Sequence, residues 1–140
     1  MLRCENLNVF YGESHILRDI SMEVQEGQVV CLMGRNGVGK TTLLKTIMGL
    51  LRPHTGHIYL NDKEATKQSP DKRVTQGIAY VPQGREIFPH LTVEENLRLG
   101  FEARRGVKDE KTAKLAYDEI YTLFPGLPGL LSRPGGVLSG

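Results

Sequence analysis

Apolar and polar residues alternate along two stretches near the start of the chain, residues 2 to 10 and residues 17 to 25. A period of two places every second side chain on one face of a β-strand, so each stretch is typical of a strand with one buried face. A glycine follows each stretch. We therefore expect two strands of a partly exposed antiparallel sheet. The alternating apolar positions are Leu7, Val9, Ile20, Met22 and Val24.

Three further segments have the composition of strands. Residues 28 to 33 form a nearly unbroken apolar run, which predicts a strand buried on both faces of a parallel sheet. Residues 77 to 81 predict another strand, which runs into Pro82. Residues 57 to 60 predict a short strand, because turn-forming residues follow it directly.

Two helices are expected in the first half of the chain. From Lys40 to Leu51, apolar residues recur at offsets of three and four, and Pro53 prevents the helix from continuing. Ser69 and Pro70 are typical of a cap and a first helical residue, so a short helix should reach about residue 76.

Two more helices are expected after residue 91. Thr92 and Glu95 have the spacing of a capping box, which predicts a helix that begins after Thr92 and reaches roughly Arg104. A second helix should run from Asp109 to Phe124. Its apolar face would consist of Ala113, Ala116, Tyr117, Ile120, Leu123 and Phe124.

Composition narrows the classes of protein. A chain of 140 residues allows one domain of ordinary size, and a net charge of +2 gives no electrostatic case for binding nucleic acid. The sequence contains no apolar segment long enough to span a bilayer and no secretory signal, so we expect a cytoplasmic protein. Cys4 and Cys31 lie in strand-like segments, which predicts two buried free thiols, and the scattered histidines argue against a zinc site.

Residues 34 to 41 read Gly-Arg-Asn-Gly-Val-Gly-Lys-Thr, the pattern G-x-x-x-x-G-K-[ST] of a phosphate-binding loop. Glycines let the backbone turn its N–H groups toward phosphate oxygens, Lys40 reaches the β- and γ-phosphates, and Thr41 offers a hydroxyl to Mg²⁺. The loop lies between an expected strand and an expected helix, which places the helix N-terminus at the phosphates. A glycine-rich turn that binds nothing is the alternative.

The loop alone leaves the class of protein open. GTPases carry a D-x-x-G motif and an N-K-x-D motif, and none of the aspartates of this chain lies in either pattern. Small-molecule kinases, motor-type ATPases and transporter ATPases remain.

Four features in the right order resemble the ATP-binding subunits of ABC transporters. Tyr11 stands where that family places the aromatic ring that stacks on adenine, and residues 34 to 42 match its Walker A loop. Gln83, which follows Tyr-Val-Pro, is similar to the glutamine of its Q-loop. The last three residues, Leu138, Ser139 and Gly140, are similar to the opening of its L-S-G-G-Q signature.

The resemblance implies an α/β fold of the P-loop NTPase class, ABC-ATPase type, and covers only the N-terminal portion of one nucleotide-binding domain. Residues 1 to 90 would form the antiparallel β subdomain and part of the parallel core sheet, and residues 91 to 140 the start of the helical subdomain. Two core strands that the family places between residues 28 to 33 and 77 to 81 are missing. We therefore expect unpaired edges, exposed apolar faces and weak stability.

The resemblance also implies the roles of the site residues. ATP would stack its adenine on Tyr11 and place its phosphates on the loop, with Mg²⁺ held by Thr41 and Gln83. No catalytic residue is present, because the family's Walker B aspartate, catalytic glutamate and switch histidine would all lie further along. The residues expected at the nucleotide are Tyr11, Gly34, Asn36, Gly37, Gly39, Lys40, Thr41, Thr42 and Gln83.

Within the family, residues 14 to 17, 34 to 39, 84 to 89 and 91 to 97 look like the branch that serves urea and branched-chain amino acid importers, and Arg35 and Val38 favour the urea type. The expected partners are transmembrane permease subunits, a second ATPase subunit in a head-to-tail dimer and, indirectly, a periplasmic or extracellular solute-binding protein. The subunit would then lie on the inner face of the membrane.

Two alternatives remain. The chain is a stand-alone module that holds ATP and does not hydrolyse it, or it is an unrelated phosphoryl-transfer enzyme such as a kinase. For the 140-residue chain itself we expect no ATPase activity above background.

Overall fold

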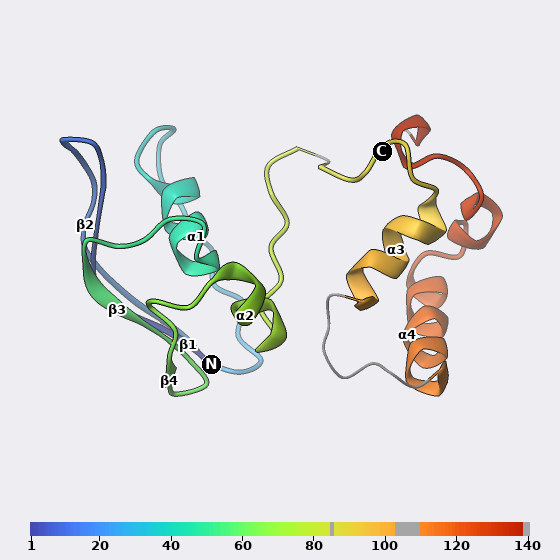
Figure 1. Cartoon of the computed structure of the whole chain (residues 1–140), viewed down its shortest axis with the longest axis horizontal. Coiled ribbons are helices and arrows are strands. Elements are labelled where there is room, and N and C mark those ends of the chain that lie inside the picture. Colours follow the sequence, from blue (N-terminus) through green and yellow to red (C-terminus); the bar gives the residue numbers. More distant parts are fainter. Residues whose placement is uncertain (85, 103–109, 139–140) are drawn as a thin grey trace. The chain divides into compact units, whose positions relative to one another are not determined.

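The computed structural model describes residues 1–84, 86–102 and 110–138. The chain divides into two compact units, Met1–Ala79 and a second unit from Tyr80 onward, which are described separately (Figure 1). Among the described residues, no helix is both long and apolar enough to span a membrane.

The first unit is built on a four-stranded antiparallel sheet. Its strands are β1 (Leu2–Tyr11), β2 (Ser14–Val24), β3 (Thr55–Leu60) and β4 (Lys63–Glu64), in the order β2-β1-β3-β4. The two long strands confirm the alternating pattern, and β3 contains the short strand expected at residues 57 to 60. β1 ends at Tyr11 and β2 begins at Ser14, so both strands are longer on the side of their connecting turn than the alternation predicts.

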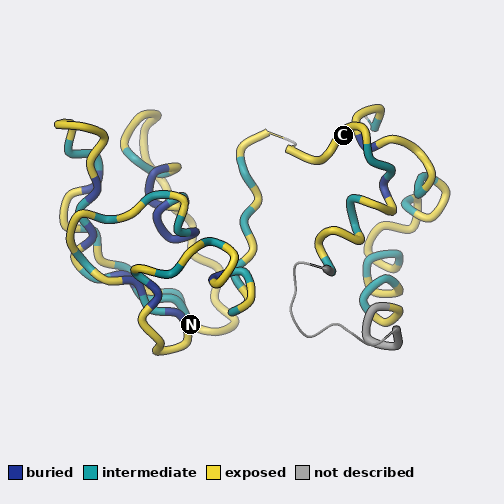
Figure 2. The backbone as a smooth tube through the Cα atoms, viewed as in Figure 1, coloured by how far each residue is buried: buried dark blue, intermediate teal, exposed yellow. Residues whose placement is uncertain are grey.

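One face of this sheet forms the core with helix α1 (Lys40–Met48). Leu7, Val9 and Ile58 of the sheet are almost completely buried, and Leu43 and Ile47 of α1 join the same cluster. Figure 2 shows buried positions recurring along the strands and along one side of α1. The alternating expectation for β1 is thereby confirmed at the level of burial.

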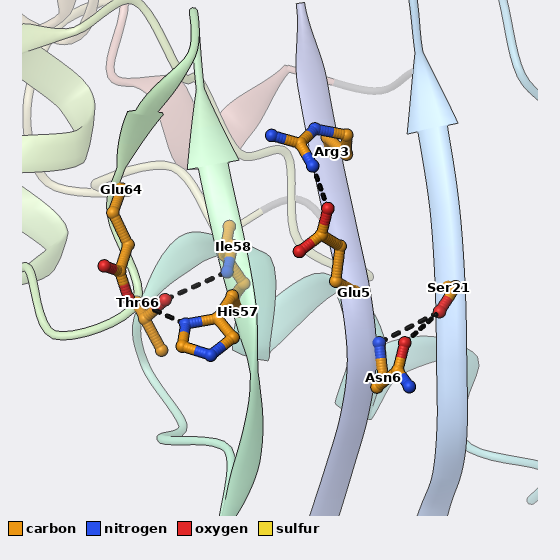
Figure 3. A network of polar contacts seen from close by, with 8 residues as sticks. All are labelled: Arg3, Glu5, Asn6, Ser21, His57, Ile58, Glu64 and Thr66. Carbon is orange, nitrogen blue, oxygen red and sulfur yellow. Dashed lines mark hydrogen bonds and ion pairs between the residues drawn. The ribbon is translucent and has the colours of Figure 1, made fainter.

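The opposite face of the sheet carries polar side chains (Figure 3). Arg3 pairs with Glu5 on β1, and His57 Nδ1 on β3 lies 2.9 Å from Glu64 Oε1 on β4. These residues alternate with the buried ones, so one face of the sheet packs and the other is polar.

Both helices expected in this unit are present. α1 ends at Met48, three residues earlier than the apolar pattern predicts, because Gly49 adopts a left-handed conformation with φ 85°. α2 spans Pro70–Thr75, with Pro70 in the first turn, as expected from a proline at this position.

Two predicted strands are wrong. Residues 28 to 33 and 77 to 81 adopt no strand conformation, and all strand pairing in the described part of the chain is antiparallel. A strand needs a neighbouring strand for its backbone hydrogen bonds, and no described segment supplies one here. The expected exposure of apolar faces is observed, since Val29, Met33 and Val81 are 98%, 85% and 88% exposed.

The two cysteines differ. Cys4 on β1 is buried, as expected, whereas Cys31 is exposed, because the run that contains it is not covered. The prediction of two buried thiols is therefore wrong for Cys31.

The second unit is helical, with α3 (Val93–Glu102), α4 (Glu110–Leu123) and two short 3₁₀ helices, η1 (Leu127–Leu130) and η2 (Gly135–Val137). The capping box at α3 is confirmed. Tyr117 packs against Phe101 of α3 with 4.7 Å between ring centroids, but Leu123 and Phe124, expected on the apolar face, are largely exposed. Ala113 and the expected helix limits at Arg104 and Asp109 lie outside the residues whose side chains or backbone are described.

Candidate nucleotide-binding site

The candidate site is centred on the glycine-rich loop that leads into α1. Gly37 and Gly39 have φ values of 82° and 98°, which an L side chain rarely adopts. A Cβ built on Gly39 would lie 2.8 Å from Leu17 Cδ2 on β2, so any side chain at this position must displace Leu17 or the loop. The Leu43 N–H donates to Gly39 O at 2.8 Å, which begins the helix directly after the loop.

Lys40 folds back over the loop. Its Nζ donates to Gly34 O and Arg35 O, at 2.6 Å in each case. These two bonds hold the lysine ammonium against the first residues of the loop, so the loop carries a positive charge.

The N-terminus of α1 has neither a side-chain cap nor an acidic residue in its first turn. Its first N–H groups therefore have no carboxylate or hydroxyl competitor, and they form the positive end of the helix dipole. Together with the lysine ammonium, this arrangement suits a phosphate anion.

The two threonines that follow Lys40 differ in environment. Thr41 is exposed, so its hydroxyl is available to a metal ion carried by a bound nucleotide. Thr42 is only 7% exposed and faces the core, so it could contribute its backbone N–H but not its hydroxyl. One protein oxygen is compatible with Mg²⁺, which usually keeps its remaining ligands from phosphates and water.

Tyr11 ends β1 and is 49% exposed. Val9, two residues earlier, pairs with Leu17, the residue that lies against Gly39. Two residues of strand span about 7 Å, so Tyr11 lies about that distance along β1 from Val9, whose partner Leu17 approaches the loop. The hairpin thus brings an exposed aromatic ring to the neighbourhood of the loop.

The remaining expected residues belong to the second unit. Gln83 is exposed, and its role at Mg²⁺ stays a prediction. Leu138 follows η2, while Ser139 and Gly140 lie outside the described residues. In the described ranges, no three His, Cys, Asp or Glu side chains are grouped so that they could hold a metal ion.

The sequence did not point to Arg73. This arginine of α2 is 1% exposed and donates four hydrogen bonds, all to backbone carbonyls. Burial lowers the pKa of its guanidinium, and burial raises the pKa of the nearby Cys4 thiol to about 11. No sequence signal distinguishes it from a solvent-facing arginine of a short polar helix.

Comparisons with known proteins identify the family of the chain. A family model described as ABC transporter matches residues 17–126. The chain is 40% identical to a probable branched-chain amino acid transport ATP-binding protein, LivF, of Archaeoglobus fulgidus and 35% identical to the high-affinity branched-chain amino acid transport protein BraG of Pseudomonas aeruginosa. Each alignment covers all of this chain, which spans 58% of the length of either relative.

Solved structures show the same fold. The chain superposes on an ATP-binding subunit of an ABC transporter with a TM-score of 0.87 and 31% identity, over 99% of this chain and 56% of that one. It also superposes on a dimeric ATP-binding cassette bound to ADP and phosphate, with a TM-score of 0.79 and 26% identity, over 99% of this chain and 63% of that one. With the family match over most of its length, the chain belongs to the ABC transporter family, and its fold is that of the N-terminal part of an ATP-binding cassette.

Proposed function

We propose that this chain is the nucleotide-binding part of the ATPase subunit of an ABC importer. The observation that carries the proposal is the loop before α1, in which Lys40 and an uncapped helix N-terminus converge. Three elements of one site, namely a cation, oriented N–H groups and the positive end of a helix dipole, favour a polyphosphate.

ATP with Mg²⁺ is the proposed ligand. Its phosphates would lie on the loop, from Gly34 to Thr42, with Asn36, Gly37 and Gly39 shaping the backbone around them. Tyr11 would stack on the adenine and contribute on the order of 1 to 3 kcal/mol. Lys40 would neutralise charge between the β- and γ-phosphates, and Thr41 and Gln83 would help to hold Mg²⁺, which would supply further positive charge to the phosphates.

The proposed solute is a branched-chain amino acid or urea. The names of LivF and BraG describe branched-chain amino acid transport, which supports a branched-chain amino acid. Arg35 and Val38 of the loop favour urea. Other relatives name other solutes: WtpC of Thermococcus kodakarensis, 36% identical over the whole chain, is a molybdate/tungstate import protein.

Hydrolysis would require more than these residues supply. A carboxylate must hold Mg²⁺ and another must orient the attacking water, and we assign neither role to any residue of this chain. We infer that the 140 residues alone bind ATP without turning it over. The subunit would act as a head-to-tail dimer on permease subunits at the inner face of the membrane, and a solute-binding protein would deliver the solute.

A titration of the 140-residue chain with a fluorescent ATP analogue and Mg²⁺ tests the proposal. We expect a saturable signal that is lost in Lys40→Ala. The signal should be kept in Lys45→Ala, which removes a different lysine of the same helix. Equal binding by the wild type and Lys40→Ala would contradict the proposed site. Phosphate release in the same samples separates a binding module from an active ATPase, and Lys40-dependent turnover would contradict the inferred lack of hydrolysis.

A further inference from the structure

The helix that follows the phosphate loop needs contacts with the rest of the protein to be stable. α1 has nine residues, about 13 Å, and a helix of that length is not stable alone in water. Its direction, and with it the direction of its first N–H groups, therefore depends on what holds its two ends.

The N-terminal end of α1 rests on the sheet. A Cβ on Gly39 would meet Leu17 and Ile16 of β2, which shows how closely the loop approaches that strand. This contact locates one end of the helix, and Leu43 and Ile47 pack its buried side into the core, so the direction of the axis also depends on what holds the other end.

Arg73 holds the C-terminal end. Its Nη1 donates to Thr46 O at 2.9 Å and to Ile47 O at 2.6 Å, two of the last carbonyls of α1. These carbonyls form the negative end of the helix dipole, so a buried cation is well placed there. All four of its hydrogen-bond partners are carbonyl oxygens, and two of them belong to the end of α1, so the helix end helps to compensate its charge.

The same guanidinium connects α1 to the sheet. Nη2 donates to Thr66 O at 3.0 Å, and Thr66 in turn accepts a hydrogen bond from the Ile58 N–H of β3 through its hydroxyl at 2.9 Å. Ile58 is completely buried in the core. Hydrogen bonds made by Thr66 and Arg73 therefore connect β3 to the end of α1.

Gly49 makes room for this arrangement. A Cβ on this residue would lie 2.9 Å from Arg73 Nε and 3.2 Å from Gln68 O. The glycine that ends the helix is thus also the residue that lets the guanidinium approach the helix end. The contact of Arg73 with α1 therefore depends on glycine at position 49.

We propose that Arg73 is a positioning residue for the phosphate loop: by fastening the C-terminus of α1 to β3, it fixes the helix axis and thereby sets the affinity for the polyphosphate of the nucleotide. The inference rests on the proposed function. It assigns a role in binding to a residue that touches neither the loop nor the phosphates.

The test measures ATP affinity of the 140-residue chain by calorimetry in Arg73→Met, Arg73→Lys and the matched control Arg52→Met, which removes an exposed arginine just past α1. The folded fraction of each variant is measured by circular dichroism under the same conditions, and affinities are corrected for it. We expect affinity to fall about tenfold in Arg73→Met, less in Arg73→Lys, which keeps the charge, and not in Arg52→Met.

A second readout separates positioning from general stabilisation. Amide exchange should become faster in α1 in Arg73→Met while the amides of β1 keep their protection. Gly49→Ala, which crowds the guanidinium and also strains the left-handed backbone at the end of α1, should lower ATP affinity in the same direction. If Arg73→Met unfolds the chain, Arg73→Lys and Gly49→Ala decide the question.

Unchanged affinity after correction for the folded fraction in Arg73→Lys and Gly49→Ala would overturn the inference. So would an equal loss of ATP affinity in Arg52→Met, because that variant leaves the hydrogen bonds from Arg73 to the end of α1 intact. A wild-type chain with no Lys40-dependent ATP binding would instead overturn the proposed function, so the two failures are distinguishable.

Discussion

Gly39 and Leu17 approach each other so closely that a Cβ on the glycine would lie 2.8 Å from Leu17 Cδ2. Gly39 also has a φ of 98°, so two independent constraints require glycine where the loop becomes α1. The residue therefore links the phosphate loop to the core of the sheet, since Leu17 is 3% exposed.

We expect Gly39→Ala to lower the free energy of unfolding by about 1 to 3 kcal/mol and to weaken ATP binding, because the added methyl must displace Leu17 or the loop. Gly37→Ala is the control: its φ of 82° is also left-handed, but a Cβ there meets no atom within 4 Å. Denaturant unfolding monitored by circular dichroism compares the two. Equal destabilisation would show that backbone strain alone, and not the contact with Leu17, accounts for the effect.

The start of α3 makes a second prediction. The Thr92 N–H donates to Glu95 Oε2 at 2.8 Å, and the Glu95 N–H donates to Thr92 Oγ1 at 3.2 Å. Each side chain therefore accepts a hydrogen bond from the backbone N–H of the other residue. Thr92→Ala should destabilise the helix by about 1 kcal/mol, with faster amide exchange in its first turn. Thr92→Ser retains the hydroxyl and should behave like the wild type. Equal protection in all three chains would contradict the importance of the cap.

The same capping box predicts a dependence on pH. Hydrogen bonds from the backbone N–H and then the hydroxyl of Thr92 lower the pKa of Glu95. A lowered pKa in the folded state means that the stabilisation is present above the pKa of the unfolded chain and is lost as pH falls through the folded value. Protection of the first turn of α3 should therefore decrease in the acid range below the ordinary glutamate pKa. In Glu95→Gln that decrease should be absent, and a decrease of the same size in the variant would assign it to another group.

How far the sequence predicts the structure depends on the range of the interactions involved. The capping box at Thr92 and the alternation along β1 were predicted correctly, because each depends on residues a few positions apart. The strand at residues 28 to 33 was not, because a strand exists only with a partner, and local hydrophobicity does not report whether one is present. Arg73 could not be found either, since its partners at Thr46 and Ile47 are 27 and 26 residues away along the chain.

The same reasoning applies to the candidate site. The loop pattern predicts that the glycines and Lys40 bind phosphate, because a phosphate loop is encoded within eight consecutive residues, and that role stays a prediction. The contact between the loop and Leu17 depends on the β1–β2 hairpin and could not be read from that pattern. What the sequence predicted was the chemistry of the loop, and what the structure added is how the loop and its helix are held.

Thiol reactivity tests the exposure of residues 28 to 33. Cys31 is exposed, whereas Cys4 is 1% exposed and its burial raises the pKa of the thiol to about 11. In the folded chain near neutral pH, one thiol per molecule should react rapidly with Ellman's reagent, and the second only after denaturation. Cys31→Ser should abolish the rapid phase and Cys4→Ser should leave it intact. Slow reaction of both thiols in the wild type would show that the 28 to 33 segment is covered in solution.

Tyr11 should contribute to nucleotide affinity through its ring and not through its hydroxyl. Because stacking on an adenine is worth on the order of 1 to 3 kcal/mol, Tyr11→Ala should weaken ATP and ADP binding by roughly tenfold, and by a similar factor for both. Tyr11→Phe keeps the ring and should bind like the wild type, while Phe10→Ala, which removes a neighbouring aromatic of the same strand, is the control for general loss of apolar surface. The measurement is the dissociation constant of each nucleotide by calorimetry. A loss confined to ATP would show that Tyr11 acts on the phosphates, and an equal loss in Tyr11→Phe would assign the effect to the hydroxyl.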